Sequence, residues 1–208
     1  TVALAASAGV SIGAHPGFPD LLGFGRRELS ASADEARAMT LYQIGALGAF
    51  AKARGVALTH VKPHGALYNM AAKRADLAAA IAEAVAAYDP ALILVGLCGS
   101  ELLKAGTAAG LRCAGEAFAD RAYRADGSLV PRGIPGAVIK DPASCAARAI
   151  SMATDGFVTA LSGERVMLRP DTICLHGDGD GALELAEALS TALREAGVEL
   201  WPLSHTDA

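Results

Sequence analysis

Apolar runs of strand length alternate with helix-like runs along the 208 residues, and this alternation limits the fold more than any other feature. Strands that are separated by helices pair in parallel as βα units. The run ALILVGL is almost wholly apolar, as expected for a strand covered on both faces. The pattern therefore predicts an α/β fold, either an open sheet or a barrel. The expected strands cover residues 9–15, 56–64, 91–97, 111–119, 171–178 and 198–203.

The helices between these strands have clear start and stop signals. Ser32 and Glu35 have the spacing of a capping box, and Gly55 is placed to end that helix. Asp141 and Pro142 suit the start of another helix, with proline at its first position. Neither GxGxxG nor GxxxxGK[ST] occurs, so the sequence indicates neither a dinucleotide-binding loop nor a Walker loop.

The composition favours a single domain over residues 1–208. Hydrophobic residues make up 52% and charged residues 19%, far from the composition of a disordered chain. The net charge of −4 argues against a nucleic-acid partner or an anionic membrane surface. No apolar run reaches the roughly 18 residues that a membrane span needs. None of the four cysteines forms a C-x-x-C pair, so we expect reduced thiols in a cytoplasmic protein.

The βα rhythm breaks at about residues 119–136. Asp126-Gly127 between short extended runs is a hairpin signal. We expect a hairpin excursion that covers a site as a lid. Arg121, Tyr123 and Arg132 in this segment are candidates for contacting an anionic ligand.

Polar and ionisable residues recur where the predicted strands end. In barrels and open α/β sheets the carboxyl ends of the strands share one rim, and ligands bind there. Four strands that end in this way predict a site at that rim. The residues are His15 after the first strand, Lys62 and His64 after the second, Glu116, Asp120 and Arg121 at the fourth, and His176 and Asp178 after the fifth.

Several of these residues also have a structural interpretation. His15 could only cap a turn, His64 could hydrogen-bond a backbone carbonyl, and Asp178 could begin a loop. Lys62 ends an apolar strand, where an unpaired ammonium would lose its charge because of desolvation. It therefore needs either a carboxylate partner, such as Glu116, or an anionic substrate.

The stretch GFGRR is a further candidate for binding an anion. Arg26 and Arg27 follow Gly23 and Gly25. A guanidinium group binds a carboxylate or phosphate through two hydrogen bonds, and glycines allow a close approach. Arg26 is the predicted substrate-binding residue, while a solvated loop accounts equally well for one of the two arginines.

A bound divalent metal stays open at this point. His15, His64 and His176 come from three strand ends, and Asp178 lies next to the last of them. Imidazoles and a carboxylate suit zinc or another divalent ion. Nothing in the spacing of these residues makes a metal specific, so neither its presence nor its identity is predicted.

Six segments of the chain resemble the LamB/YcsF family, whose members are the A subunits of 5-oxoprolinase. They are IGAHPGFPDLLGFGRR, YQIGALGAF, HVKPHGALYN, FADRAY, GSLVPRGIPGAVI and DTICLHGD. Carried over residue by residue, the family's HPG motif falls on residues 15–17, KPHGALY on 62–68, ADRAY on 119–123 and HGD on 176–178. The resemblance implies an incomplete (β/α) barrel of the seven-stranded glycoside hydrolase/deacetylase type.

The resemblance has one departure, at the start of the chain. The family pattern begins with an acidic strand of the DLNxDxGE kind and a histidine-bearing HAGD segment, and neither is present. The first residues, TVALAASAG, look like the second half of a helix with no strand before it. We therefore expect two N-terminal strands, with several site acids, to be missing from this sequence.

The resemblance implies ATP-dependent opening of the 5-oxoproline (pyroglutamate) lactam to L-glutamate, together with two other subunits. ATP, with Mg²⁺, would serve the complete complex. The predicted catalytic residues are His15, Lys62, His64, Glu116, His176 and Asp178, and the predicted substrate-binding residues are Arg26, Asp120, Arg121, Tyr123 and Arg132.

Within such a mechanism His64 or His176 would act as general base or acid. Asp178 or Glu116 would orient an imidazole, and Lys62 or an arginine would hold the substrate carboxylate. Two alternatives stay open: a metal-dependent amide or N-acetyl hydrolase that acts alone, and a non-catalytic subunit that binds the lactam. A homo-oligomer is compatible with each of them.

Overall fold

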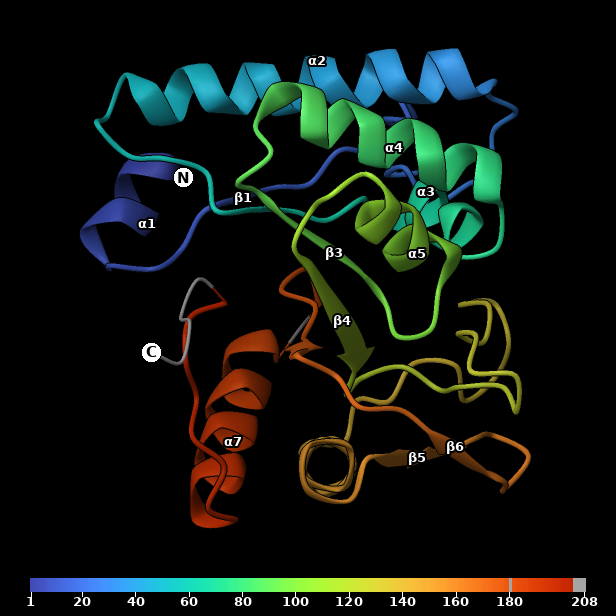
Figure 1. Ribbon diagram of the computed structural model, residues 1–208. Helices are drawn as coiled ribbons and strands as arrows, with labels where there is room; N and C mark the ends of the chain where they lie inside the picture. Colours follow the sequence, from blue (N-terminus) through green and yellow to red (C-terminus); the bar gives the residue numbers. More distant parts are fainter. Residues whose placement is uncertain (180, 204–208) are drawn as a thin grey trace. The chain divides into compact units, whose positions relative to one another are not determined.

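The computed structural model describes residues 1–179 and 181–203, and the chain falls into two compact units (Figure 1). The first unit is Thr1–Ala114 together with residues 202 and 203, and the second is Gly115–Trp201. Each unit has buried apolar clusters of its own. The single domain over residues 1–208 stays a prediction.

The first unit carries parallel strands and the helices that precede and follow them. Its helices are α1 (Val2–Ser7), α2 (Ala33–Lys52), α3 (Gly65–Ala71), α4 (Ala75–Tyr88) and α5 (Glu101–Ala108). Its strands are β1 (Gly13–Ala14), β2 (His60–Val61) and β3 (Ile93–Leu97), and β4 (Cys113–Phe118) begins in this unit and continues into the second.

The strands β1, β2 and β3 pair in parallel, as the alternating pattern predicts. Gly13 pairs with His60, and His60 in turn pairs with Ile93. All five residues of β3 are buried, in agreement with its apolar sequence. The strand order of the sheet is β1-β2-β3-β4-β7. The α/β fold class is thereby confirmed.

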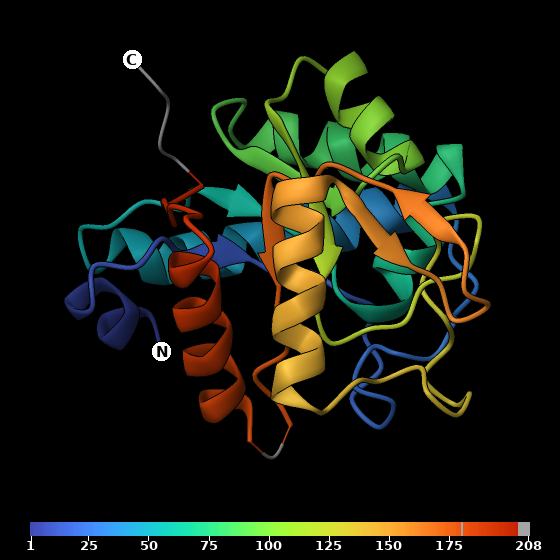
Figure 2. The ribbon, with the colours of Figure 1, turned by 90° about the horizontal axis from the view of Figure 1, so that it is seen from below.

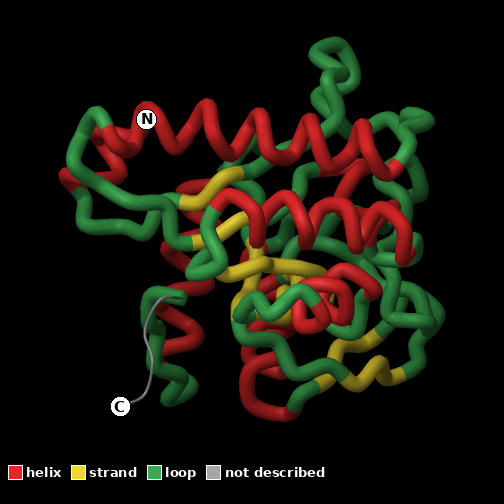
Figure 3. The backbone as a smooth tube through the Cα atoms, turned by 45° about the horizontal axis from the view of Figure 1, so that its top comes forward, coloured by secondary structure: helices red, strands yellow, loops and turns green. Residues whose placement is uncertain are grey.

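β1 and β2 are much shorter than the strands predicted for residues 9–15 and 56–64, as the short yellow segments of Figure 3 show. Single backbone hydrogen bonds nevertheless continue along these segments. Lys62 N donates to Ala14 O at 2.9 Å, and His64 N donates to Pro16 O at 2.8 Å. The residues after β2 therefore still run beside the residues after β1.

Helices α2 and α4 lie side by side (Figure 1). Ile44 of α2 belongs to one buried cluster with Leu77 and Ile81 of α4 and Leu94 of β3. The predicted capping box at the start of α2 is present: Ser32 Oγ accepts a hydrogen bond from Glu35 N, and the Glu35 carboxylate accepts one from Ser32 N. Local sequence signals and burial therefore agree in fixing this helix.

In the second unit, β4 pairs in parallel with β7 (Thr172–Cys174), with Glu116 opposite Thr172. The loop after β4 contains two isolated antiparallel bridges, one between Arg121 and Val138 and one between Tyr123 and Leu129. Helix α6 (Pro142–Ile150) continues as the π-helical turn η1 (Ser151–Asp155), and α7 (Ala182–Glu195) packs beside α6 (Figure 2).

Two elements differ from the predictions. Strands β5 (Phe157–Thr159) and β6 (Arg165–Met167) form an antiparallel hairpin that was not predicted, because each has three residues with only the middle one buried. The strand predicted for residues 198–203 is wrong, since the described part of the chain has no strand after β7. At its end Leu203 O accepts a hydrogen bond from the Arg112 side chain at 3.1 Å rather than from a ladder partner.

No disulfide joins any of the four cysteines, all of which lie in the described part of the chain. Burial, followed by the charge of Asp120, raises the pKa of the Cys145 thiol to about 11, so this residue is not poised as a thiolate. Across residues 1–179 and 181–203, no helix combines the length and the apolar character that a membrane crossing requires.

The capping box gives a first stability prediction. We expect Ser32→Ala to lower the free energy of unfolding by about 1 kcal/mol, because Glu35 N then loses its side-chain acceptor. Ser30→Ala, at an exposed position just before the helix, is the control and should change it by less than about 0.5 kcal/mol. Urea denaturation measures both variants, and equal effects would contradict a capping role.

The two interior glycines of α2 give a second prediction. A Cβ on Gly48 would lie 1.9 Å from Tyr88 Oη, whereas a Cβ on Gly45 would meet nothing within 4 Å. Gly45→Ala should therefore raise the free energy of unfolding by about 0.5–1 kcal/mol through helix propensity alone. Gly48→Ala should be less stable than Gly45→Ala by about 1 kcal/mol, because the Tyr88 side chain has to move aside. Denaturation curves in which Gly48→Ala is as stable as Gly45→Ala would disprove this packing.

Candidate functional site

Two of the predicted histidines meet at the strand ends of the first unit. His15 follows β1 and His64 follows β2, and His15 Nε2 lies 3.0 Å from His64 Nδ1. The outer nitrogens contact backbone carbonyls: His15 Nδ1 lies 2.6 Å from Lys62 O, and His64 Nε2 lies 2.7 Å from Phe24 O. We call this arrangement the His15–His64 pair. Each ring therefore has a backbone partner and a histidine partner, and the catalytic roles of His15 and His64 stay predictions.

Glycines make room for His64. A Cβ on Gly25 would lie 2.9 Å from His64 Cδ2, and one on Gly17 would lie 3.2 Å from His64 Cβ. Gly25 and Gly65 also have positive φ values of +67° and +58°, which other residues rarely adopt. The glycines of the HPG, GFG and KPHG stretches therefore shape the contacts of His64.

An internal ion pair holds the loop between β1 and α2. Arg27 donates to the Asp20 carboxylate, and this hydrogen bond lowers the pKa of Asp20 to about 2. Asp20 Oδ1 also accepts a hydrogen bond from Gly23 N at 2.9 Å. Arg27 is thus a structural residue of the loop. The guanidinium of Arg26 instead lies over the Phe24 ring, 5.0 Å from its centroid, and a substrate contact of Arg26 stays a prediction.

In the second unit, His176 forms a pair with a buried carboxylate. His176 Nδ1 lies 2.6 Å from Asp120 Oδ2, and the His176 ring stacks on Phe118. Asp120 is 6% exposed, and its second oxygen, Oδ1, is buried with no hydrogen-bond partner among the residues that the structure describes. The role predicted for Asp120 was substrate binding, whereas its contact here is with an imidazole. This contact fixes the side of the ring that carries the proton.

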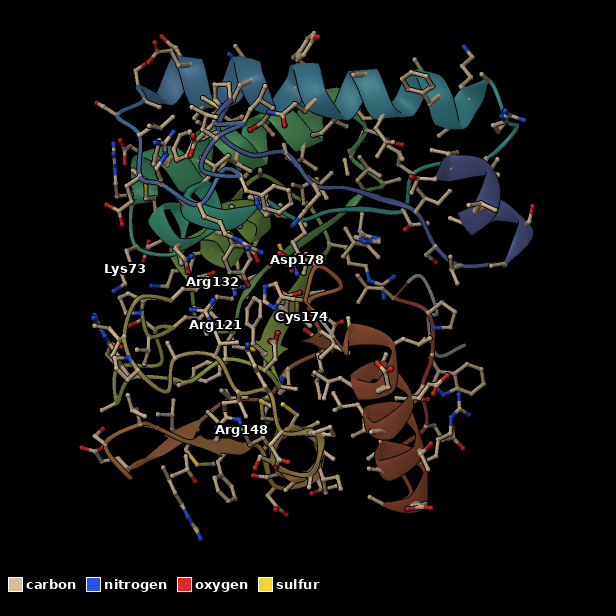
Figure 4. The ribbon with its side chains drawn as sticks, turned by 180° about the vertical axis from the view of Figure 1, so that it is seen from behind. Lys73, Arg121, Arg132, Arg148, Cys174 and Asp178 are labelled. Carbon is tan, nitrogen blue, oxygen red and sulfur yellow. The ribbon has the colours of Figure 1, made fainter. Side chains whose placement is uncertain are left out.

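The other predicted residues of the loop after β4 form hydrogen bonds with backbone atoms. Arg121 is buried and donates to Val130 O at 2.5 Å and to Ala137 O at 3.3 Å, and Phe118 N donates to the Tyr123 hydroxyl at 2.8 Å. Arg148 of α6 donates to Arg121 O at 2.6 Å; both arginines are labelled in Figure 4. These contacts maintain the loop. Substrate contacts of Arg121 and Tyr123 stay predictions.

The remaining candidates differ in exposure. Glu116 on β4 is 3% exposed, Lys62 is half-buried, and Asp178 and Arg132 are exposed. Arg132 and Asp178 are both labelled in Figure 4. Their roles stay predictions, as does the meeting of the candidate residues of both units at one rim.

The side chains that the structure describes do not gather into a metal centre. In the part of the chain that the structure describes, no three or more His, Cys, Asp or Glu side chains gather as a metal site would require. The two facing nitrogens of the His15–His64 pair instead contact each other. No step below is therefore assigned to a metal.

Two contributing residues, one in each unit, were not predicted. Phe24 contributes its backbone carbonyl, and Arg148 contributes hydrogen bonds to the loop that carries Asp120. A signal for Phe24 exists in the sequence, since it lies between two glycines in GFGRR. No local signal marks Arg148, because its partners lie 11 to 29 residues away along the chain.

Sequence comparison connects the chain with the A subunits of 5-oxoprolinases. It is 54% identical over 200 residues to the 5-oxoprolinase A subunit of Geobacillus thermodenitrificans (strain NG80-2), covering 96% of this chain and 78% of that protein. It is 55% identical over 203 residues to the corresponding protein of Pyrococcus abyssi (strain GE5 / Orsay), covering 98% and 80%. The corresponding protein of Bacillus subtilis (strain 168) is 52% identical over 205 residues, covering 99% and 80%.

A solved structure and a family model agree with these relatives. The crystal structure of the lactam utilization protein from Thermus thermophilus matches with a TM-score of 0.88 and 52% identity, covering 96% of this chain and 79% of that chain. The model of the LamB/YcsF family matches residues 1–208. The resemblance noted in the sequence is confirmed, and the chain belongs to the LamB/YcsF family.

Proposed function

We propose that this chain is the A subunit of a 5-oxoprolinase, which opens the lactam of 5-oxoproline to L-glutamate with hydrolysis of ATP. Membership of the LamB/YcsF family supports this proposal, as do the relatives at 52–55% identity that are named as A subunits of 5-oxoprolinase. The solved relative is named for lactam utilization. The chemistry is hydrolysis of a cyclic amide.

The complete enzyme includes two further subunits. The names of the relatives support the presence of partners, because they designate each relative as one subunit of an enzyme. ATP, with Mg²⁺, is used by the complex, and ATP binding belongs to the other subunits rather than to this chain. The absence of a Walker loop from the sequence agrees with that division. A cytoplasmic location remains a prediction.

Opening a lactam requires three events. Phosphorylation of the amide oxygen by ATP makes the carbonyl carbon more electrophilic. A water oxygen then bonds to this carbon while a base takes a proton from the water. Finally the C–N bond breaks, its electron pair stays on nitrogen, and the nitrogen gains a proton as the free amine. In this last event a second water also cleaves the acyl phosphate that remains, which gives the carboxylate and inorganic phosphate. This chain must therefore contribute groups that bind the lactam, remove a proton and return one.

The contact between His176 and Asp120 is the observation that carries the mechanism. The Asp120 carboxylate can only accept, so His176 Nδ1 donates to it at 2.6 Å. In the neutral imidazole Nε2 is then unprotonated and can take the proton of the attacking water. The carboxylate also stabilises the imidazolium that results. Asp120 is thus proposed as the residue that orients the base, the role that was expected from the sequence for Asp178 or Glu116.

The cationic residues have a supporting role in this proposal. Lys62 and Arg26 are proposed to hold the substrate carboxylate. Arg132, which is exposed, is proposed to contact a further negative charge of the bound ligand. Glu116, buried on β4, and Asp178, exposed after β7, keep their predicted catalytic roles without an assigned step.

Two variants of the second unit test this mechanism in the complete complex with ATP. We expect His176→Gln to lower kcat for glutamate release by roughly 10²- to 10⁴-fold, the usual contribution of a general base. Asp120→Asn should also lower kcat, because an amide can leave Nδ1 rather than Nε2 as the unprotonated nitrogen. Steady-state release of glutamate from 5-oxoproline is the measurement.

Asp155→Asn is the matched control, since it changes an exposed carboxylate of the same unit. It should leave kcat and KM unchanged. If His176→Gln and Asp120→Asn both retained wild-type turnover, the base would not be His176, and a non-catalytic lactam-binding subunit would become the better assignment.

A further inference from the structure

Each ring of the His15–His64 pair has one nitrogen against a backbone carbonyl. His15 Nδ1 lies 2.6 Å from Lys62 O, and His64 Nε2 lies 2.7 Å from Phe24 O. A carbonyl oxygen only accepts hydrogen bonds, so both of these ring nitrogens carry a proton. The other two ring nitrogens, His15 Nε2 and His64 Nδ1, face each other at 3.0 Å.

This geometry determines how many protons the pair holds. A neutral imidazole has one ring proton, and in both rings that proton is already on the nitrogen that faces a carbonyl. Two neutral rings would therefore place two lone pairs 3.0 Å apart with no hydrogen between them. A third proton converts the same contact into an N–H···N hydrogen bond, donated by a charged ring to a neutral one.

We propose that His15 and His64 share three ring protons and act together as a single cation that binds an anion, rather than as a general base. The identity of the anion, the carboxylate of 5-oxoproline, rests on the proposed function, whereas the proton count does not. The proposal assigns the His15–His64 pair a positive charge and no part in removing a proton.

The surroundings of the pair suit an anion. His15 is exposed and His64 is half-buried, so a ligand can reach the rings. The Phe24 and His64 rings meet edge to face, with centroids 5.3 Å apart, and the Arg26 guanidinium lies over the Phe24 ring, 5.0 Å from its centroid. The acid of the same loop, Asp20, is already paired with Arg27.

Phe24 is the positioning residue for the pair. Its φ is +54°, in the left-handed region that residues with a Cβ rarely adopt. With this conformation the Phe24 carbonyl oxygen accepts a hydrogen bond from His64 Nε2 at 2.7 Å. Gly25, with φ +67°, follows directly and approaches the His64 ring so closely that a Cβ would lie 2.9 Å from Cδ2. The backbone of this loop therefore fixes which His64 nitrogen is protonated.

The proton count can be measured without turnover. Protein labelled with ¹⁵N-histidine would be examined by long-range ¹H–¹⁵N correlation at the pH of the activity assay. We expect protonated His15 Nδ1 and His64 Nε2 and one further proton shared between His15 Nε2 and His64 Nδ1. Two unprotonated facing nitrogens, or an unprotonated nitrogen at either carbonyl, would overturn the proposal.

Variants identify the partner of the shared proton. His15→Gln should leave His64 protonated on Nε2 alone, while His60→Gln, the control from the neighbouring strand β2, should leave the signals of the pair unchanged. Persistence of a proton on His64 Nδ1 in His15→Gln would overturn sharing. If His15→Gln does not fold, His64→Gln gives the reciprocal test, and the wild-type spectrum decides by itself.

Kinetics of the complete complex test the assigned role. His15→Gln should raise KM for 5-oxoproline on the order of tenfold, the cost of losing a positive charge close to the substrate carboxylate, and should change kcat less. A loss confined to kcat, as expected for Asp120→Asn, would show that the pair is not the anion-binding cation. Failure of the wild-type complex to use 5-oxoproline would overturn the proposed function, while the spectra would still decide the proton count.

Discussion

The close approach of two backbones beside His64 is the constraint on which the candidate site of the first unit depends. Gly25 O accepts a hydrogen bond from Ala66 N at 2.9 Å, and a Cβ on Gly65 would lie only 2.4 Å from the same oxygen. The positive φ of both glycines adds a second reason for their presence. The loop after β1 can therefore lie against the start of α3, and this contact brings the Phe24 carbonyl to the imidazole. The protonation of the His15–His64 pair follows from the backbone rather than from acidic side chains.

Different partners give the same type of side chain different chemistry in the two units. His176 has a carboxylate on one nitrogen, which favours a ring that accepts a proton on the other. The outer nitrogens of His15 and His64 face backbone carbonyls, and their inner nitrogens face each other. This arrangement favours a ring pair that keeps an additional proton between the two inner nitrogens. The second unit also fixes its loop with arginines, because buried Arg121 and half-buried Arg148 both donate to backbone carbonyls. Burial lowers the pKa of Arg148, but its guanidinium still donates hydrogen bonds to the backbone carbonyls of Ala119 and Arg121.

Local signals in the sequence were sufficient for the fold class and for the contact of His15 with His64. The capping box of α2 and the apolar run of β3 depend on neighbouring residues, and both are present in the structure. The position of His15 and His64 after adjacent parallel strands also follows from the alternation of strands and helices, so their contact could be expected. The roles of the site residues remain predictions, since they depend on a ligand.

Features that depend on distant partners could not be predicted. The contact of Asp120 with His176 joins residues 56 positions apart, and nothing near either residue selects that partner over Asp178 or Glu116. The hairpin of β5 and β6 has too few buried residues to give a period-two pattern. The apolar residues of 198–203 resemble a strand in sequence, but they pair with no strand in the described part of the chain. Phe24 was missed because its contribution is a carbonyl, which every residue has.

The most direct test of the central claim is the release of glutamate from 5-oxoproline by the partner subunits with ATP, measured with this chain present and with it omitted. The account predicts glutamate formation coupled to ATP hydrolysis only when the chain is present. Glutamate released at the same rate without the chain, or no glutamate from the complete complex, would contradict it.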